Sequence, residues 1–187
     1  MDNPRERHKA IAIPMSEIDD LKHFLVVHDR RYREWTFVTG GCRRREVYNP
    51  LRCAVRELEE ETRGLINLKK GTYSYFKFTT DTQEPRDIED GVGALNHYHV
   101  YIFNLPMTSG EHRHIIKRFT EEKKKMEGAE VPFRKNYDEN DECRFETLSS
   151  IIRCANLWPM IRDHVITNPE FIQGISAPHW IPFNLRD

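Results

Sequence analysis

Hydrophobic positions divide the first part of the chain into short apolar segments with charged residues between them. Ala10–Pro14 is predicted to form a short strand that ends at its proline, and Phe24–His28 a buried strand. A charged turn follows, and Glu34–Val38 is predicted to return as the second strand of a hairpin. Because side chains alternate along a strand, Trp35 and Phe37 share one face. We expect Phe37 to pack in the core, whereas Trp35 is a candidate for lining a substrate cleft.

The rest of the chain alternates strand and helix patterns. Thr72–Thr80 interleaves aromatic and polar residues and His97–Leu105 is strongly apolar, so both are predicted strands. His97 and His99 share one strand face, where an exposed or hydrogen-bonded face is favoured over a metal pair because no third ligand lies nearby in sequence. His112–Met126 has the spacing of a basic helix. The other predicted segments are loops at Asp81–Asn96 and Pro132–Asp141, a strand at Glu142–Leu148, helices at Ser149–Cys154 and Leu157–Val165, and an irregular tail at Pro178–Asp187.

A helix is predicted between Asn49 and Gly64. Asn49 suits the N-cap and Pro50 the first helical position, and Gly64 is placed to end the helix. The mostly apolar positions of this segment recur at helical spacing and form a stripe: Leu51, Ala54, Val55, Leu58 and Thr62. The stripe is expected to pack inward, which leaves the acidic residues on another face.

Glu57, Glu60 and Glu61 stand at positions i, i+3 and i+4 of this helix and so share one face. Like charges at this spacing repel one another unless a cation lies among them. Mg²⁺ or Mn²⁺ is the natural occupant, since both take oxygen ligands. On the carboxylates alone, a solvated surface run is the favoured interpretation. The adjacent glycines Gly40 and Gly41 allow a loop backbone to approach the same place.

Residues 40–65 carry a spaced pattern of glycine, glutamate and arginine. Five residues separate Gly40 from Glu46, residues 56–61 read Arg-Glu-Leu-Glu-Glu-Glu, and residues 64–65 are Gly-Leu. This stretch resembles the Nudix box, whose pattern is G-x5-E-x7-R-E-U-x-E-E-x-G-U, where U is a bulky aliphatic residue. The resemblance favours a functional acidic face over a plain surface.

Two positions depart from the Nudix pattern. Nine residues, rather than seven, separate Glu46 from Arg56, and Arg63 is an extra residue before Gly64. The first change is absorbed in the loop before the helix and the second falls at the helix end, but together they leave the role of Glu46 open. The family's fold is an α/β/α sandwich with a mixed β-sheet, so the resemblance implies this α/β fold as a single domain over residues 1–187.

The resemblance implies a hydrolase that uses Mg²⁺ or Mn²⁺ to cleave a nucleoside diphosphate linked to another moiety. Such a metal polarises a phosphoryl oxygen and lowers the pKa of a bound water, and a nearby carboxylate takes the proton of that water. Arg56, Glu57 and Glu60 are the implied catalytic residues, with Arg56 gripping a glutamate, most naturally Glu57, through its guanidinium fork. The implied metal ligands are Gly40, Glu57, Glu60, Glu61 and Glu142, with Glu139 as the second candidate for the last position.

Basic residues flank the predicted site. Arg43, Arg44 and Arg45 directly follow the two glycines, where they either bind substrate phosphates or offset the charge of the glutamates. Together with Trp35 they are the predicted substrate-binding residues. Lys123–Lys125, at the end of the predicted basic helix, either suit its C-terminus as solvated groups or contact phosphate or RNA.

The Nudix box indicates the diphosphate and not the group attached to it. The box and the strand before it resemble the baculovirus-type members of the family, described as ADP-ribose pyrophosphatases, which favours a viral protein with ADP-ribose as substrate. The alternative substrate is the 5′ cap of mRNA, because cap-cleaving members also carry basic residues around the box. A third alternative is a catalytically weak domain that only binds nucleotides, although the intact residues 56–61 argue against it.

Composition narrows the classes of partner. The net charge of −1 argues against a general polyanion-binding protein. With no apolar run of transmembrane length and no secretory signal pattern, no membrane partner is expected. The absence of a C-x-x-C pair argues against zinc and for reduced thiols in the cytoplasm or nucleus, of a host cell if the protein is viral. The expected partner is a nucleotide-diphosphate substrate, with capped RNA and a homodimer left open.

Overall fold

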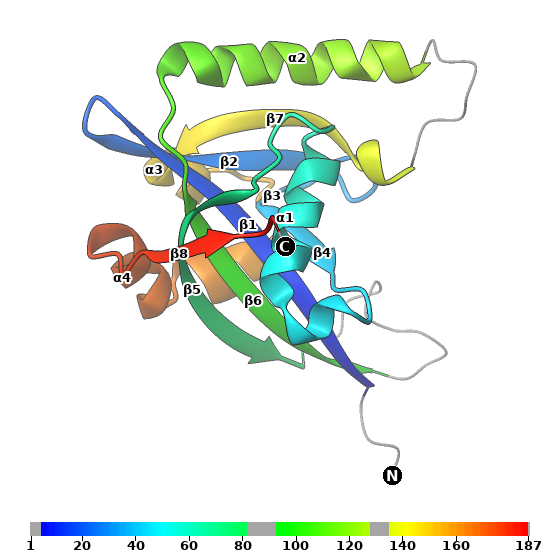
Figure 1. The fold of residues 1–187 in the computed structure, drawn as a ribbon, viewed down its shortest axis with the longest axis vertical. Coiled ribbons are helices and arrows are strands. Elements are labelled where there is room, and N and C mark those ends of the chain that lie inside the picture. The colour runs from blue at the N-terminus through cyan, green and yellow to red at the C-terminus, as the bar shows by residue number, and fades with distance from the viewer. Residues whose placement is uncertain (1–4, 82–92, 128–134, 187) are drawn as a thin grey trace.

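The computed structural model describes residues 5–81, 93–127 and 135–186, which are built around one mixed sheet of eight strands (Figure 1). The strands are β1 (Arg5–Ile18), β2 (Leu21–Asp29), β3 (Trp35–Thr36), β4 (Val38–Gly41), β5 (Lys70–Thr80), β6 (Ala94–Asn104), β7 (Asn140–Thr147) and β8 (Ile181–Asn184). Their hydrogen-bonded order is β3-β2-β1-β6-β5-β8, with β4 paired to β1 and β7 paired to β2. β1 and β6 run parallel, and the other pairs run antiparallel.

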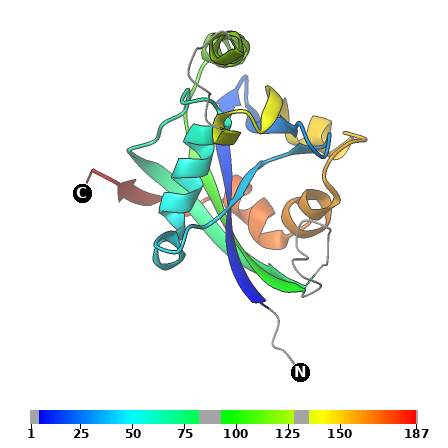
Figure 2. The same cartoon turned by 90° about the vertical axis from the view of Figure 1, so that its right-hand side faces the viewer.

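Helices cover both faces of this sheet. They are α1 (Pro50–Glu61), α2 (Ser109–Glu127), α3 (Leu148–Ile152) and α4 (Pro169–Ser176), with 3₁₀ turns at Glu46–Tyr48 and Lys135–Tyr137 and a π-helical turn at Ile161–Ile166. α1 and α2 contribute to the core on one face, and α3, the π-helical turn and α4 to the core on the other (Figure 2). The predicted α/β/α sandwich with a mixed β-sheet is confirmed.

β1 crosses the middle of the sheet, with alanines buried toward α1 and isoleucines buried toward the opposite core. It was predicted to end at Pro14, but it continues to Ile18. The amide of Leu105, just after β6, donates to the carbonyl of Met15 at 2.9 Å, so alternation turns the nitrogen of Pro14 toward the other edge of β1. There Pro14 falls between the residues paired with β4 and those paired with β2. The strand tolerates the proline because no ladder hydrogen bond is required of it.

The predicted hairpin differs from the observed chain path. Glu34–Val38 is divided, because β3 pairs with β2 over only two residues and the chain then moves to β1 as β4. β7 occupies much of the length of β2, while β1 pairs with β2 only at Met15–Ile18 and is thereby free to pair with β4 at Lys9–Ala12. The loop that carries Gly40 is thus fixed to the central strand.

The C-terminal third also departs from prediction. The predicted helix at Leu157–Val165 is a π-helical turn that follows Pro159, and the sequence did not predict α4. The tail predicted as irregular contains β8, which extends the sheet beyond β5. β6 and β7 begin a few residues before their predicted starts, and residues 82–92 and 132–134 of the predicted loops lie outside the described residues.

α2 is the longest helix, with 19 residues, but only His112 and Phe119 of it are buried. The ring of His112 stacks on Phe145 of β7 with centroids 3.9 Å apart, and Ser16 of β1 is 2.7 Å from its Nε2. These contacts place α2 along β7, on the same face as α1 (Figure 2). Across the described ranges, no helix combines the length and apolar character needed to cross a membrane.

α1 begins as predicted. Pro50 is its first residue and Asn49 holds the N-cap position, although the asparagine side chain makes no capping hydrogen bond. The helix ends at Glu61, and Arg63 and Gly64 then take positive φ angles of 55° and 80°. The amide of Gly64 donates to the carbonyl of Glu59 at 2.7 Å, which closes the helix C-terminus.

Candidate active site

Three carboxylates meet beside the second half of α1. Glu57 and Glu61 project from α1 and Glu139 from the residue before β7, and one oxygen of each lies within 4.8 Å of the others. Glu57 and Glu61 are buried, while Glu139 is exposed overall but turns its carboxyl toward the cluster. Within residues 5–81, 93–127 and 135–186, this is the one group of acidic, histidine or cysteine ligands that could hold a metal.

The electrostatics of this carboxylate cluster favour a bound cation. Burial, and then the charge of Glu57, raises the pKa of Glu61 well above its usual value. Burial also raises the pKa of Glu57, against the opposing effect of Arg56. Burial and the charges of Glu57 and Glu60 raise the pKa of Glu139 to about 7. Glu61 Oε2 is buried with no hydrogen-bond partner, so this all-oxygen donor set fits a hard divalent cation such as Mg²⁺ or Mn²⁺.

Two neighbours hold these carboxylates in place. A Cβ atom at Gly40 would lie 2.0 Å from Cδ of Glu57, so only glycine allows this approach of the β4 backbone to α1. The side-chain amide of Asn140 donates to Glu61 Oε1 at 3.0 Å. Gly40 therefore lies directly against the cluster, as the resemblance implied.

The guanidinium of Arg56 bonds three carboxylates, those of Glu46, Glu57 and Glu60. Its Nε and Nη2 each donate to Glu46 at 2.8 Å, and its Nη1 donates to Glu57 at 2.9 Å and to Glu60 at 3.1 Å. Burial opposes ionisation of Glu46, but the hydrogen bonds from Arg56 and from the Arg43 amide lower the pKa of its carboxyl overall. Glu46, whose role the sequence left open, is the bidentate partner that orients Arg56.

Glu60 and Glu142 lie outside the carboxylate cluster. Besides its bond from Arg56, Glu60 accepts from Arg43 Nη2 at 3.4 Å. Glu142 accepts from Nε and Nη2 of Arg144 at 2.9 and 2.7 Å, and its side chain is 47% exposed. Of the two candidates near β7, Glu139 is the one placed to bind a metal with Glu57 and Glu61.

A cavity of about 180 Å³ opens beside the cluster. Its lining combines the glycine loop with residues from several strands: Lys9, Asp29, Glu34, Thr36, Thr39, Gly40, Gly41, Glu61, Glu139 and Trp158. Lys9, opposite Gly41 in the β1–β4 pair, brings a cation to this cavity that no sequence pattern indicated. Arg44 and Arg45 are exposed and do not line this cavity. Among the described residues, Arg43 is the one arginine of the three whose side chain bonds a glutamate of the predicted site, Glu60.

Arg63, the extra residue of the box, joins the end of α1 to the segment that carries Glu139. Its buried guanidinium donates to three backbone carbonyls at 2.7, 2.7 and 3.2 Å, those of Phe119, Asn140 and Tyr137. Because Asn140 in turn bonds Glu61, Arg63 fixes both partners of that contact. The spacing of the box shows an insertion here, but it does not show that the inserted side chain turns inward.

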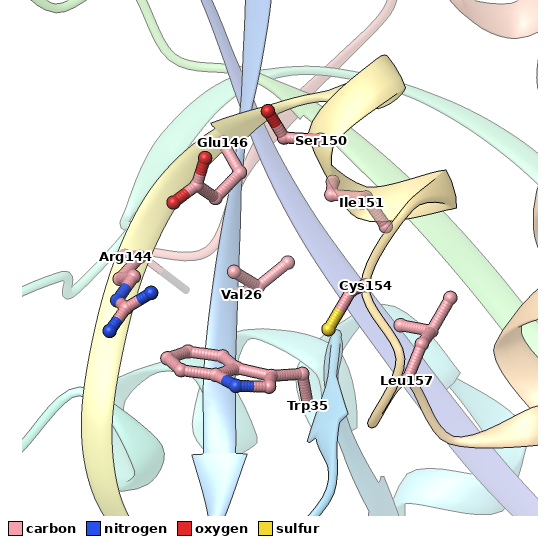
Figure 3. A pocket seen from close by; sticks show the side chains of 8 residues that line it. All are labelled: Val26, Trp35, Arg144, Glu146, Ser150, Ile151, Cys154 and Leu157. Carbon is pink, nitrogen blue, oxygen red and sulfur yellow. The ribbon is translucent and has the colours of Figure 1, made fainter.

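Trp35 and the lysines predicted to contact substrate do not line the cavity at the carboxylate cluster. Trp35 lines a separate cavity, with the guanidinium carbon of Arg144 4.8 Å from the centroid of its ring system (Figure 3). Lys123–Lys125 lie in the last turns of α2, where Lys125 pairs with Glu122 at 3.2 Å.

The strand histidines take part in hydrogen bonds with neighbouring side chains. His99 Nε2 lies 3.1 Å from His8 Nδ1, and its Nδ1 lies 2.9 Å from the hydroxyl of Tyr75. His97 Nδ1 lies 3.2 Å from the hydroxyl of Thr79. Burial and the neighbouring His8 lower the pKa of His99 to about 4. The hydrogen-bonded strand face predicted for His97 and His99 is confirmed.

Comparison with known proteins agrees with the fold and the box. A family model described as NUDIX domain matches residues 6–148. The NUDIX domain of Shewanella oneidensis NrtR, solved with ADP ribose, superposes with a TM-score of 0.52 over 87% of this chain and 84% of that chain, at 8% sequence identity. A mutT/nudix family protein from Listeria innocua superposes with a TM-score of 0.50 over 86% of this chain and 90% of that chain, at 13% identity. No curated protein sequence matches the chain.

The solved structures show the fold alone at these identities, whereas the family model spans well over half of the chain. The matched residues include the glycine loop, α1 and Glu139, which are the parts that meet in the carboxylate cluster. The chain that brings them together belongs to the Nudix family and is a hydrolase of phosphoric anhydride bonds.

Proposed function

We propose that the protein is a divalent-metal-dependent pyrophosphohydrolase that cleaves a nucleoside diphosphate linked to another moiety. The observation that carries this proposal is the convergence of Glu57, Glu61 and Glu139 beside a cavity that Lys9 also lines. A diphosphate is an anion, so a site for it needs positive charge to offset both the phosphates and the glutamates. A cation in the carboxylate cluster and the ammonium of Lys9 supply that charge.

Each residue has a distinct role in this proposal. Glu57, Glu61 and Glu139 hold Mg²⁺ or Mn²⁺, next to the backbone of Gly40. Such an ion would supply Lewis acidity to the phosphoryl group and to the attacking water. Arg56 fixes the rotamers of Glu57 and Glu60 through its two bonds from Nη1. Glu60, which Arg56 holds beside Glu57, is the proposed acceptor for the proton of the attacking water.

ADP-ribose is the first candidate substrate. The sequence favours it through the family resemblance, and a net charge of −1 suits a small substrate better than a long polyanion. The NUDIX domain of NrtR, which has a similar fold, was solved with ADP ribose.

Capped RNA is the second candidate, and one observation favours it. A further cavity of about 420 Å³ shares Asp29 and Glu139 with the cavity at the carboxylate cluster and is also lined by Arg30, Arg31, Tyr32 and Asp138, the ion-pair partner of Arg30. Guanidinium groups and an aromatic ring beside the cleavage site suit the backbone and first base of a nucleic acid chain. The two cavities adjoin at Asp29 and Glu139, so a substrate that extends beyond its diphosphate can reach the second one.

A substrate panel tests the proposal. ADP-ribose, diadenosine polyphosphates, deoxynucleoside triphosphates and capped RNA are each incubated with Mg²⁺ and with Mn²⁺, and products are separated by chromatography. We expect cleavage within the phosphate chain of at least one of them, and none in excess chelator. Full activity in chelator would exclude the metal mechanism, and nucleotide binding without any cleavage would favour the catalytically weak domain.

Salt dependence separates the two candidate substrates. If capped RNA is the substrate, kcat/KM falls steeply with salt as counterions are released, and replacing Lys123–Lys125 with alanine lowers it further. If ADP-ribose is the substrate, kcat/KM depends weakly on salt and the triple-lysine variant matches the wild type. The matched measurement is kcat/KM for both substrates at low and high salt in both proteins.

A further inference from the structure

Trp35 forms part of a second cavity, of about 240 Å³, whose lining comes from β2, β3, β7, α3 and the segment after α3 (Figure 3). Apolar groups come from Val26, Trp35, Ile151, Cys154 and Leu157, and polar groups from Arg144, Glu146 and Ser150. A mainly apolar cavity with a few polar groups is the usual form of a small-molecule site. The carboxylate cluster and its diphosphate chemistry do not account for this second cavity.

The carboxylate of Glu146 is the unusual group in this lining. It projects from β7 into the cavity, and across the described residues no hydrogen bond or ion pair engages it (Figure 3). The nearest strand cation on the same face, Arg144, is already held by Glu142 at 2.7 Å. A half-buried carboxylate without a bonded partner keeps its acceptor sites available for a ligand that donates hydrogen bonds.

We propose that this cavity binds the base of the substrate and selects guanine over adenine. The ring system of Trp35 provides a stacking surface for any base, which would displace or stack beside the Arg144 guanidinium that now lies 4.8 Å from the ring centroid. The two oxygens of Glu146 match the N1–H and the 2-amino group of guanine, which donate side by side along one edge. Adenine places an acceptor at N1 on the same edge, so its lone pair faces the carboxylate. This inference rests on the proposed pyrophosphohydrolase function and names the base of its substrate.

The two cavities share a wall. Trp35 lines the base cavity, and the next residue, Thr36, lines the cavity at the carboxylate cluster. Likewise, Leu157 lines the base cavity and Trp158 lines the cavity at the cluster. The amide of Trp158 donates to the carbonyl of Trp35 at 2.8 Å, which fastens the two segments together. A base stacked on Trp35 is therefore adjacent to the space where its phosphates would be cleaved.

β7 gives the length scale of this arrangement. Trp35 pairs with His28, and His28 pairs with Glu142, three residues along the chain from Glu139. Three residues of extended chain span roughly 10 Å, and the two strand spacings between Trp35 and Glu142 add roughly 10 Å across the sheet, so the backbones of Trp35 and Glu139 lie on the order of 14 Å apart. The two side chains cover part of that distance, and a ribose with the first phosphates covers the rest, so a nucleoside with its base on Trp35 can place its diphosphate at the carboxylate cluster.

Equilibrium binding provides the test, because it does not depend on turnover. GDP, IDP and ADP are titrated calorimetrically with Mg²⁺ into Glu61→Gln protein, which is expected to cleave poorly. We expect GDP to bind about tenfold more tightly than ADP, with IDP between them because it keeps N1–H but lacks the 2-amino group. Equal affinities for GDP and ADP would overturn the inference.

Two variants assign the selectivity to its residues. Adding Glu146→Gln should bring GDP within about twofold of ADP, since an amide cannot accept both hydrogen bonds. Adding Trp35→Ala should weaken GDP, IDP and ADP alike by about tenfold or more, because stacking does not depend on the base. The matched control is Glu170→Gln, which removes a carboxylate on α4 that does not line this cavity. It should keep the preference for GDP over ADP that the parent Glu61→Gln protein shows. Retained guanine selectivity in Glu146→Gln protein would assign recognition elsewhere and contradict the proposal.

The outcomes distinguish this inference from the proposed function. If GDP is selected through Glu146 but no diphosphate is cleaved, the base site stands and the hydrolytic proposal fails. If adenine and guanine compounds are bound and cleaved equally, hydrolysis stands and the base site fails. If both hold, substrates that carry guanine next to the diphosphate, such as capped RNA, rank ahead of ADP-ribose.

Discussion

The two halves of the carboxylate cluster are held in place by different means. Glu57 and Glu61 lie on one short helix, and Arg56 on the same helix orients Glu57 through partners at most 15 residues away in sequence. Glu139 belongs to a distant segment, which Arg63 ties to α1 across a sequence separation of 77 residues at Asn140. The helix half therefore depends on a local pattern, whereas the strand half depends on tertiary contacts that bring distant residues together.

Glu61→Gln should have the largest effect, because Glu61 touches both halves. The change keeps the size of the side chain but removes a charged ligand, so we expect kcat to fall on the order of a hundredfold or more. Without metal, the free energy of unfolding should hold or rise, since one buried carboxylate is neutralised. Steady-state kinetics and urea unfolding in chelator measure the two effects.

Glu59→Gln is the control for that change. Glu59 lies on α1 but outside the cluster, so its loss should leave kcat nearly unchanged. Near-normal turnover in Glu61→Gln protein would reduce the acidic face to a surface feature.

Arg63→Met tests the strand half. Three carbonyls lose a charged donor in a buried place, so we expect the free energy of unfolding to fall by about 3 kcal/mol. The segment that carries Glu139 also loses its tie to α1, so the Mg²⁺ concentration for half-maximal activity should rise about tenfold. Arg30→Met is the matched control, because Arg30 binds Asp138 but is 39% exposed and should cost little.

Glu139→Gln and Glu142→Gln sharpen the assignment within the strand half. Glu139 lies in the cluster, so its change should lower kcat/KM by about tenfold and raise the Mg²⁺ requirement. Glu142 pairs with Arg144 at the surface, so its change should stay within about twofold. If a magnesium titration showed a larger rise in the Mg²⁺ requirement for Glu142→Gln than for Glu139→Gln, the metal-binding role would belong to Glu142.

The histidine group on the sheet lies outside the carboxylate cluster and gives a smaller, pH-dependent effect. His99 has a folded-state pKa of about 4, with His8, Lys77, His97 and the Tyr75 hydroxyl around it. Between about pH 6.5 and 4 the unfolded chain therefore binds more protons at this position, and stability is lost as pH falls through that window.

His99→Gln isolates that contribution. The variant should lose less stability than the wild type between pH 7 and pH 5, with a difference on the order of 1 kcal/mol. Urea unfolding at the two pH values measures it, and an identical pH dependence in both proteins would exclude His99 as the source.

Local patterns predicted the parts of the molecule whose contacts are local. The spacing of Glu57 and Glu61 fixes their shared helix face, and Gly40 must be glycine because Glu57 fills the place of its side chain. Arg56 was predicted to grip a glutamate, and it grips several, with Glu46 reached in spite of the longer loop.

Residues that act through distant contacts gave no such signal. Glu139 and Glu142 are both acidic residues near the start of a strand, and only the path of the chain around Arg63 decides which of them faces α1. Lys9 reaches the site because β1 pairs with β4, and Trp35 and Glu146 meet because β3 and β7 both pair with β2. These encounters depend on strand order and register, which periodicity does not specify.

β8 also affects how the protein behaves in solution. It covers Lys70–Tyr73 at the outer edge of β5, and Phe183 packs against Tyr73 and Phe103 with ring centroids 5.8 and 5.7 Å apart. Pro182 in the middle of β8 has no amide hydrogen to offer, which makes this strand a poor template for another chain. A protein that lacked β8 would present both an open strand edge and uncovered aromatic rings, the combination that drives edge-to-edge aggregation.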